Sequence, residues 1–217
     1  MTKFSVSGQH YLFDVQTFAH TVLAHGGDEY EYALRDRTTQ GVIDDVASGV
    51  SELGVLLRTS AAADKLDEAF EAADVEYTEL VQSAPRVALP ASHPMSNAKK
   101  LSLDDLVDWP YVHFDQGADA PVEFAEEALA EVPRAKSITC TDRASLSELI
   151  VALNGYTVTS GILVGIADGA QLTTVPLDTD VTLHLGIITR KGETPSELGA
   201  SFVERLKKNL ERYVASL

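Results

Sequence analysis

Residues 4–20 read FSVSGQHYLFDVQTFAH, and this stretch contains a strand, a polar turn and a helix. Phe4 to Gly8 alternate as a half-buried strand does, and the apolar residues from Val15 onward recur at helical spacing. A helix start presents unpaired backbone N–H groups and a partial positive charge. The polar turn between the two elements is therefore either a tight connection or one wall of a ligand site.

The same succession of strand, polar turn and helix recurs at 111–131 and at 137–154. Strands that alternate with helices of roughly ten residues predict a mostly parallel α/β sheet. The chain of 217 residues is long enough for one large domain or two small ones, and the repetition suggests two α/β lobes.

Apolar spacing also predicts which helix faces are buried. In the helix over 14–25 the expected buried face consists of Val15, Phe18, Val22 and Leu23. The next helix is capped by Thr38, and its expected buried face consists of Val42, Ile43, Val46 and Val50. Two capping boxes open later helices, Ser145 with Glu148 and Thr194 with Glu197.

Composition excludes several classes of function. The formal charge of −16 repels phosphate backbones, so we do not expect this chain to bind DNA or RNA by itself. The single cysteine, Cys140, rules out a disulfide within the chain and suits a reducing compartment. No apolar run approaches ~20 residues, and the N-terminus lacks the pattern of a secretory signal. We therefore expect a cytoplasmic protein with no membrane partner.

Motifs for other chemistries are missing from the sequence. No histidine pair has i, i+4 spacing and no cysteine pair exists, which argues against a metal site. Neither a G-x-S-x-G elbow nor a nucleotide-binding glycine loop occurs. We expect no cofactor and no enzymatic activity.

Three segments carry a resemblance to a known family: VIDDVASGVSELGVLL (42–57), VALPASHPMSNAKKLSLDDLVDWPYVHF (87–114), and the helix 145–154 followed by Gly155 and the strand to Ser160-Gly161. In order and spacing they resemble the effector-binding domain of LysR-type transcriptional regulators. The resemblance covers essentially the whole chain.

The resemblance implies a fold like that of type 2 periplasmic binding proteins. Two Rossmann-like lobes would be joined by two crossover segments near 82–90 and 174–183, with a ligand cleft between them. The first lobe would comprise 1–83 plus 180–217, and the second 84–179.

The resemblance also implies partners. The family's N-terminal winged helix-turn-helix is absent from these 217 residues, so DNA would be bound only through that domain, and Met1 would be an artificial start of an expressed fragment. We expect a homodimer, which could assemble into a tetramer in the full-length protein. The helices over 14–25 and 121–131 are the expected interface.

Ligands of open α/β sheets bind beyond the carboxyl ends of strands. The polar residues that follow the predicted strands, several of them at turns where the family places its effector pocket, are Ser7, Gly8, Gln9, His10, Arg58, Thr59, Asp115, Gln116, Arg143, Thr159 and Ser160. Some have plainer interpretations. Ser145 can be a simple helix cap, Arg143 can pair with an acidic neighbour such as Asp142, and Asp115 can cap a helix or repel an anion.

The predicted function is the sensing of a small metabolite, which modulates DNA binding by the N-terminal domain. Helix N-termini and arginines favour an organic anion as the effector. His10 would make binding depend on pH if it contacts the ligand. The alternatives are a solute-binding protein of a transporter and an enzyme of the same two-lobed fold. A helix-turn-helix encoded just upstream would separate them.

Overall fold

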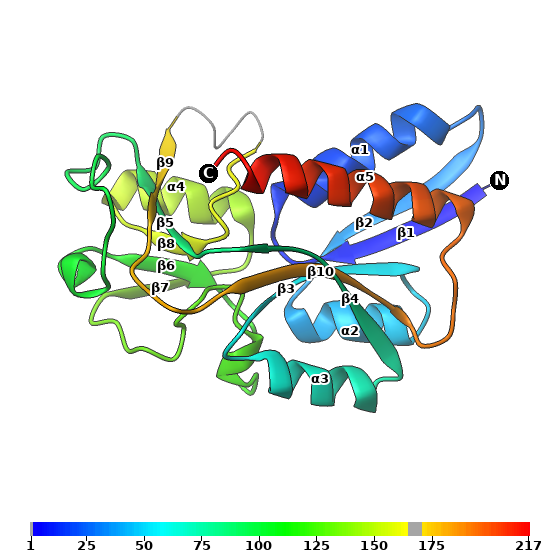
Figure 1. Ribbon diagram of the computed structural model, residues 1–217, viewed down its shortest axis with the longest axis horizontal. Helices are drawn as coiled ribbons and strands as arrows, with labels where there is room; N and C mark the ends of the chain where they lie inside the picture. Colours follow the sequence, from blue (N-terminus) through cyan, green and yellow to red (C-terminus); the bar gives the residue numbers. More distant parts are fainter. Residues whose placement is uncertain (1, 165–170) are drawn as a thin grey trace.

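The computed structural model describes residues 2–164 and 171–217, and it shows a mixed α/β molecule with its strands in two groups (Figure 1). One group is a five-stranded sheet of order β2-β1-β3-β10-β4. Its strands are β1 (Thr2–Gly8), β2 (Tyr30–Asp36), β3 (Leu53–Thr59), β4 (Val75–Ser83) and β10 (Leu183–Arg190). Strands β1, β2 and β3 run parallel, whereas β10 is antiparallel to β3 and β4.

Four helices cover this sheet: α1 (Leu12–His25), α2 (Thr39–Ala47), α3 (Ala63–Ala72) and α5 (Glu197–Val214). Figure 1 shows α1 and α5 on one face and α2 and α3 on the other. The Phe4 ring packs against Phe18 of α1 and Phe202 of α5, with centroids 5.9 and 6.0 Å away. On the opposite face, Leu66 and Phe70 of α3 are buried, four residues apart on one side of the helix.

The second group of strands is smaller. Strands β5 (Arg86–Pro90), β8 (Thr157–Thr159) and β9 (Leu172–Pro176) form an antiparallel sheet of order β8-β5-β9. Strands β6 (Tyr111–Phe114) and β7 (Ser137–Cys140) form a parallel pair. Helix α4 (Arg143–Leu153) and two 3₁₀ turns, η1 (Asp104–Leu106) and η2 (Val122–Phe124), complete this group.

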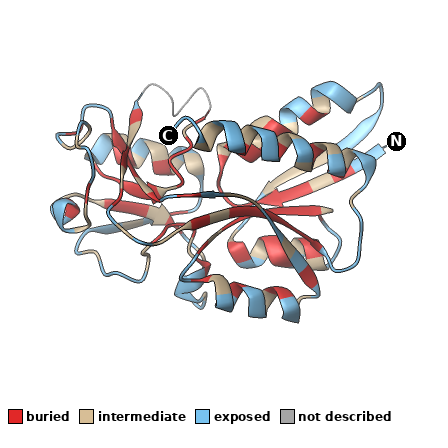
Figure 2. Ribbon diagram, in the orientation of Figure 1, coloured by how far each residue is buried: buried red, intermediate tan, exposed pale blue. Residues whose placement is uncertain are grey.

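We call β1–β4, β10 and their four helices the large-sheet half, and β5–β9 with α4 the small-sheet half. The chain crosses between the halves twice, from β4 to β5 and from β9 to β10 (Figure 1). One hydrophobic core contains residues of both halves, among them Val6, Leu57, Val87 and Val158. Figure 2 shows the buried residues on the central strands and on the inner faces of the helices. No helix of the described part is long and apolar enough to cross a membrane.

The predicted helix over 121–131 is wrong. Its first residues form only the 3₁₀ turn η2, and turns follow. Leu129 has a φ of 60°, which a continuing helix cannot accommodate. The neighbouring carboxylates of Glu126 and Glu127 are both buried and bind different elements, His10 and the backbone of Phe114. These tertiary contacts override the helical composition of the segment.

The buried face of α1 also differs from the expected one. Its buried residues are Phe13, Asp14, Thr17 and Thr21, whereas Leu23 is 84% exposed. The two threonine hydroxyls donate to backbone carbonyls four residues earlier, so they are hydrogen-bonded while buried. Val50, expected on the buried face of α2, lies beyond the end of that helix and is exposed.

Two predicted caps are displaced along the chain. Asp142 caps α4 by accepting the Ser145 N–H, and Ser196 caps α5 by accepting the Gly199 N–H. Thr38 caps α2 as predicted.

Candidate functional site

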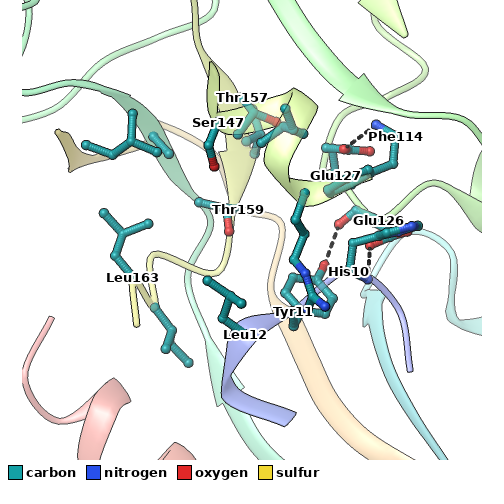
Figure 3. Close-up of a pocket in the computed structure, with 16 residues that line it drawn as sticks. His10, Tyr11, Leu12, Phe114, Glu126, Glu127, Ser147, Thr157, Thr159 and Leu163 are labelled. Atoms are coloured by element: carbon teal, nitrogen blue, oxygen red, sulfur yellow. Dashed lines mark hydrogen bonds and ion pairs between the residues drawn. The ribbon is translucent and has the colours of Figure 1, made fainter. Parts of the chain in front are cut away.

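A cavity lies where the start of α1, the side of α4 and strand β8 meet (Figure 3). It is narrow, about 70 Å³, within a hollow of about 620 Å³ that includes its opening to solvent. Its apolar lining includes Leu12, Leu146, Ile162, Leu163 and Leu172. Polar side chains stand at a few points among them, as is typical of sites for small organic ligands.

The chief positive group of the cavity is Arg143, the first residue of α4. Its Nη2 donates to both carboxylate oxygens of Asp36, at 2.9 and 2.7 Å. Its Nη1 lies 3.8 Å from Asp14 Oδ1 and is buried without a hydrogen-bond partner in the structure. One nitrogen of Arg143 is thus hydrogen-bonded to Asp36, whereas the other has only a long ion-pair contact with Asp14.

Asp14 is buried behind Arg143, and its Oδ2 has no hydrogen-bond partner. Burial raises its pKa to about 8, although Arg143 and the Val15 N–H act in the opposite direction. Gly8 makes room for this carboxyl group, because a Cβ at position 8 would collide with Asp14 Oδ2. The glycine of the first turn therefore serves packing.

His10 contacts the small-sheet half. Its Nδ1 lies 2.7 Å from Glu126 Oε1, its backbone N–H donates to Glu126 Oε2 at 3.0 Å, and its ring stacks on Phe114. Burial acts to lower the pKa of His10, but the hydrogen bond and charge of Glu126 outweigh it, so the pKa lies above its ordinary value. Figure 3 shows this pair at one end of the cavity.

Further contacts join the halves beside this pair. The Thr39 N–H donates to Gln116 Oε1 at 2.8 Å, and the Thr39 hydroxyl donates to the Phe124 carbonyl at 2.7 Å. Gln116 Nε2 in turn donates to Glu126 Oε1 at 3.0 Å. The N-terminus of α2 is thus occupied by side chains and backbone of the protein itself.

The remaining wall carries hydroxyl groups. Ser147 of α4 and Thr157 and Thr159 of β8 line the cavity together with Val158, and Figure 3 shows the three hydroxyl side chains near one another. Thr157 Oγ1 is buried and has no hydrogen-bond partner in the structure. Glu127 also borders the cavity, where it accepts the Phe114 N–H through Oε1.

The structure brings His10, Arg143 and Thr159 of the sequence-predicted residues to this cavity. Ser7 and Gln9 are buried beneath the turn, where Ser7 bonds Asp45 and Ser51 and Gln9 bonds Thr39 and the Leu57 N–H. The Ser160 hydroxyl accepts the Ile162 N–H.

The other predicted residues lie away from the cavity. Arg58 pairs with Asp67 and stacks on Tyr77, and Thr59 accepts the Ala62 N–H. Asp115 and Gln116 border a different hollow beside β6, and Asp115 accepts the Gly117 N–H. Arg143 does line the cavity, but its acidic partner is Asp36 of the large-sheet half rather than Asp142.

Sequence reasoning missed the apolar lining and the two adjacent glutamates. Thr157 has a usable signal, because it lies two residues from Thr159 on the same strand and therefore on the same face. Glu126 and Glu127 had none, since they fall in a segment that we expected to form a helix. Among the described residues no group of His, Cys, Asp and Glu could hold a metal ion.

Comparison with known proteins identifies the family. The model of the LysR substrate binding domain matches residues 28–211. The chain therefore belongs to this family, and it has the two-lobed fold of type 2 periplasmic binding proteins expected for a LysR-type effector-binding domain. No curated protein matches the chain.

Solved structures of similar fold agree with this assignment. HinK, a LysR-family regulator from Pseudomonas aeruginosa, has a TM-score of 0.65 at 18% identity over 96% of this chain and 70% of its own. The effector-binding domain of a BenM variant has a TM-score of 0.66 at 17% identity over 98% and 96%. The effector-binding domain of QuiR, solved with shikimate, has a TM-score of 0.62 at 11% identity over 97% and 98%.

Proposed function

We propose that this domain senses a small organic anion, which binds in the cavity between α1, α4 and β8. The observation that carries the proposal is the buried, unbonded Nη1 of Arg143 in a cavity that is otherwise mostly apolar. A guanidinium with one nitrogen free of hydrogen bonds in such surroundings favours a carboxylate, which can take up two of its N–H groups.

The hydroxyl wall opposite supports a ligand that carries further polar groups. Ser147, Thr157 and Thr159 could hydrogen-bond the hydroxyl groups of such a molecule. Shikimate, found in QuiR, is a hydroxylated carboxylic acid and belongs to this chemical class. Asp142 and Glu148 line an adjacent hollow that Arg143 also borders, and their negative charge opposes anion binding, so Arg143 is the group that would attract the anion.

Residues 1–83 with 180–217 and residues 84–179 would act as the two lobes. The effector would favour one relative orientation of the lobes and shift the population toward it. That change would pass through a homodimer to the N-terminal domains, which would bind the DNA.

Thermal-shift measurements with matched carboxylate–amide pairs, from butanoate and butanamide up to shikimate and its amide, test this function. We expect carboxylates to raise the melting temperature more than their amides, because only the carboxylate pairs with Arg143. Arg143→Gln should abolish the difference. Arg58→Gln is the matched control, because Arg58 is also paired with a carboxylate but lies outside the cavity. Equal shifts for acids and amides in every pair would refute an anionic effector.

A further inference from the structure

We propose that Arg143 is a latch between the two halves, and that the effector's carboxylate opens it by replacing Asp36 on the guanidinium. This inference rests on the proposed function, because it concerns the regulation of the same site. It assigns Asp36 as a competitor of the effector.

The position of the ion pair supports a latch. Arg143 begins α4 in the small-sheet half, and Asp36 ends β2 in the large-sheet half. The two residues are 107 positions apart in the sequence, so their contact joins the halves non-locally. Both border a second hollow, which shares Leu12, Ser147 and Leu172 with the main cavity. A ligand in the main cavity is therefore next to the ion pair.

The geometry of the pair leaves it open to replacement. Only Nη2 reaches the carboxylate of Asp36, and Nη1 is unbonded. A carboxylate in the cavity could engage Nη1 and Nη2 together, in the two-bond arrangement that arginine favours. The side chain of Asp36 is 40% exposed, so water can solvate it after release. Asp14, the other acidic neighbour, is buried and stays 3.8 Å from Nη1.

The consequence would be a change in the neighbouring contacts. The His10 and Thr39 N–H groups both donate to side chains of the small-sheet half, Glu126 and Gln116. Release of Asp36 would remove the ion pair that joins the halves beside these two hydrogen bonds. Their amide hydrogens would then exchange faster with solvent, which makes them direct reporters of the latch.

The first experiment measures butanoate and butanamide affinity by NMR titration of wild type, Asp36→Asn and Arg143→Gln. If Asp36 competes, Asp36→Asn should bind butanoate about two- to fivefold more tightly, the range expected for loss of a partly exposed ion pair. If Asp36 merely positions Arg143, the variant should bind more weakly. Weaker or unchanged binding would overturn the proposal. Asp178→Asn is the matched control, since Asp178 pairs with Lys100 outside the cavity.

The second experiment follows amide hydrogen exchange at His10 and Thr39, first without ligand. Asp36→Asn and Arg143→Gln should both speed exchange at these two amides, while Asp178→Asn should not. Saturating butanoate should speed exchange in the wild type, whereas a ligand that only tightens the halves would slow it. Unchanged exchange in the two variants would refute the latch even if carboxylates bind. A wild type without carboxylate preference would refute the proposed function, and the ligand-free exchange would still decide on the latch.

Discussion

Glu126 and Glu127 are adjacent buried glutamates whose hydrogen bonds differ. Glu126 Oε1 lies near His10 Nδ1 and accepts from Gln116, and Glu126 Oε2 accepts the His10 N–H. Glu127 Oε1 accepts the Phe114 N–H, and Glu127 Oε2 has no hydrogen-bond partner in the structure. Burial and the charge of Glu126 raise the pKa of Glu127 to about 8.

The raised pKa of Glu127 predicts a pH dependence of stability. Between its ordinary pKa of 4.5 and about 8 the folded protein keeps the proton that the unfolded chain loses, so the free energy of unfolding falls as pH rises. Glu127→Gln cannot ionise, so its urea-unfolding free energy should fall less steeply over this range. The slope of the unfolding free energy against pH should become shallower by at most about 1.4 kcal/mol per pH unit.

Glu123→Gln is the control for this measurement, because Glu123 is exposed on the same segment. Its pH profile should match the wild type. A Glu127→Gln profile parallel to that of the wild type from pH 5 to 8 would mean that Glu127 is ionised in the folded protein.

At the residue scale, the polar turns of the sequence include three residues that line the candidate cavity. His10 and Arg143 follow strands and Thr159 ends one, so the rule about strand ends selects them. The same rule selects Ser7 and Gln9, which turn inward because they hydrogen-bond Asp45 and Thr39. Side-chain direction at a turn depends on these distant partners, which local spacing does not reveal.

At the element scale, helix α5 has two candidate N-cap residues, Thr194 and Ser196. The sequence favoured Thr194, but Ser196 accepts the Gly199 N–H at 3.1 Å and donates to Glu52 at 3.0 Å. Ser196→Ala should therefore lower the free energy of unfolding by about 1 kcal/mol, as loss of an N-cap usually does. Chemical denaturation measures this change.

Thr194→Ala provides the comparison, because Thr194 is not the residue that caps the helix. Its stability should stay within about 0.5 kcal/mol of the wild type, as for most surface substitutions. The reverse order of the two variants would place the cap at Thr194.

Strand positions were easier to predict than helix faces. Strands β1, β6 and β7 begin the three strand–turn–helix successions of the sequence, and the structure has these strands where the pattern indicates. The α1 face was mispredicted because Thr17 and Thr21 are buried there and satisfy their hydroxyls within the helix. The sequence pattern predicts a mostly parallel sheet, so it does not predict the antiparallel pairing of β5 with β8 and β9.

At the scale of the whole molecule, charge predicts a response to salt. The chain has 33 acidic and 17 basic residues, so like charges repel one another in the compact state. Raising sodium chloride from about 10 mM to 150 mM shortens the screening length from roughly 30 to 8 Å. We expect the melting temperature to rise with this change, as measured by calorimetry.

Sucrose is not a suitable control here, because it stabilises folded proteins by exclusion from their surface. Tetramethylammonium chloride at the same ionic strength separates general screening from specific sodium binding, and it should give the same rise. A melting temperature that falls with salt would mean that the exposed ion pairs outweigh the net repulsion.

The register between β4 and β10 places Ser83 directly opposite Leu183. The chain therefore leaves the five-stranded sheet and returns to it at one rung of an antiparallel ladder, where paired Cα atoms are only about 4.5–5.5 Å apart. In connectivity, everything between these residues is an insertion into a β-hairpin. The two ends of this insertion lie side by side on paired strands. A rotation at this point would therefore change the orientation of the inserted residues relative to the five-stranded sheet without breaking any strand pair of that sheet.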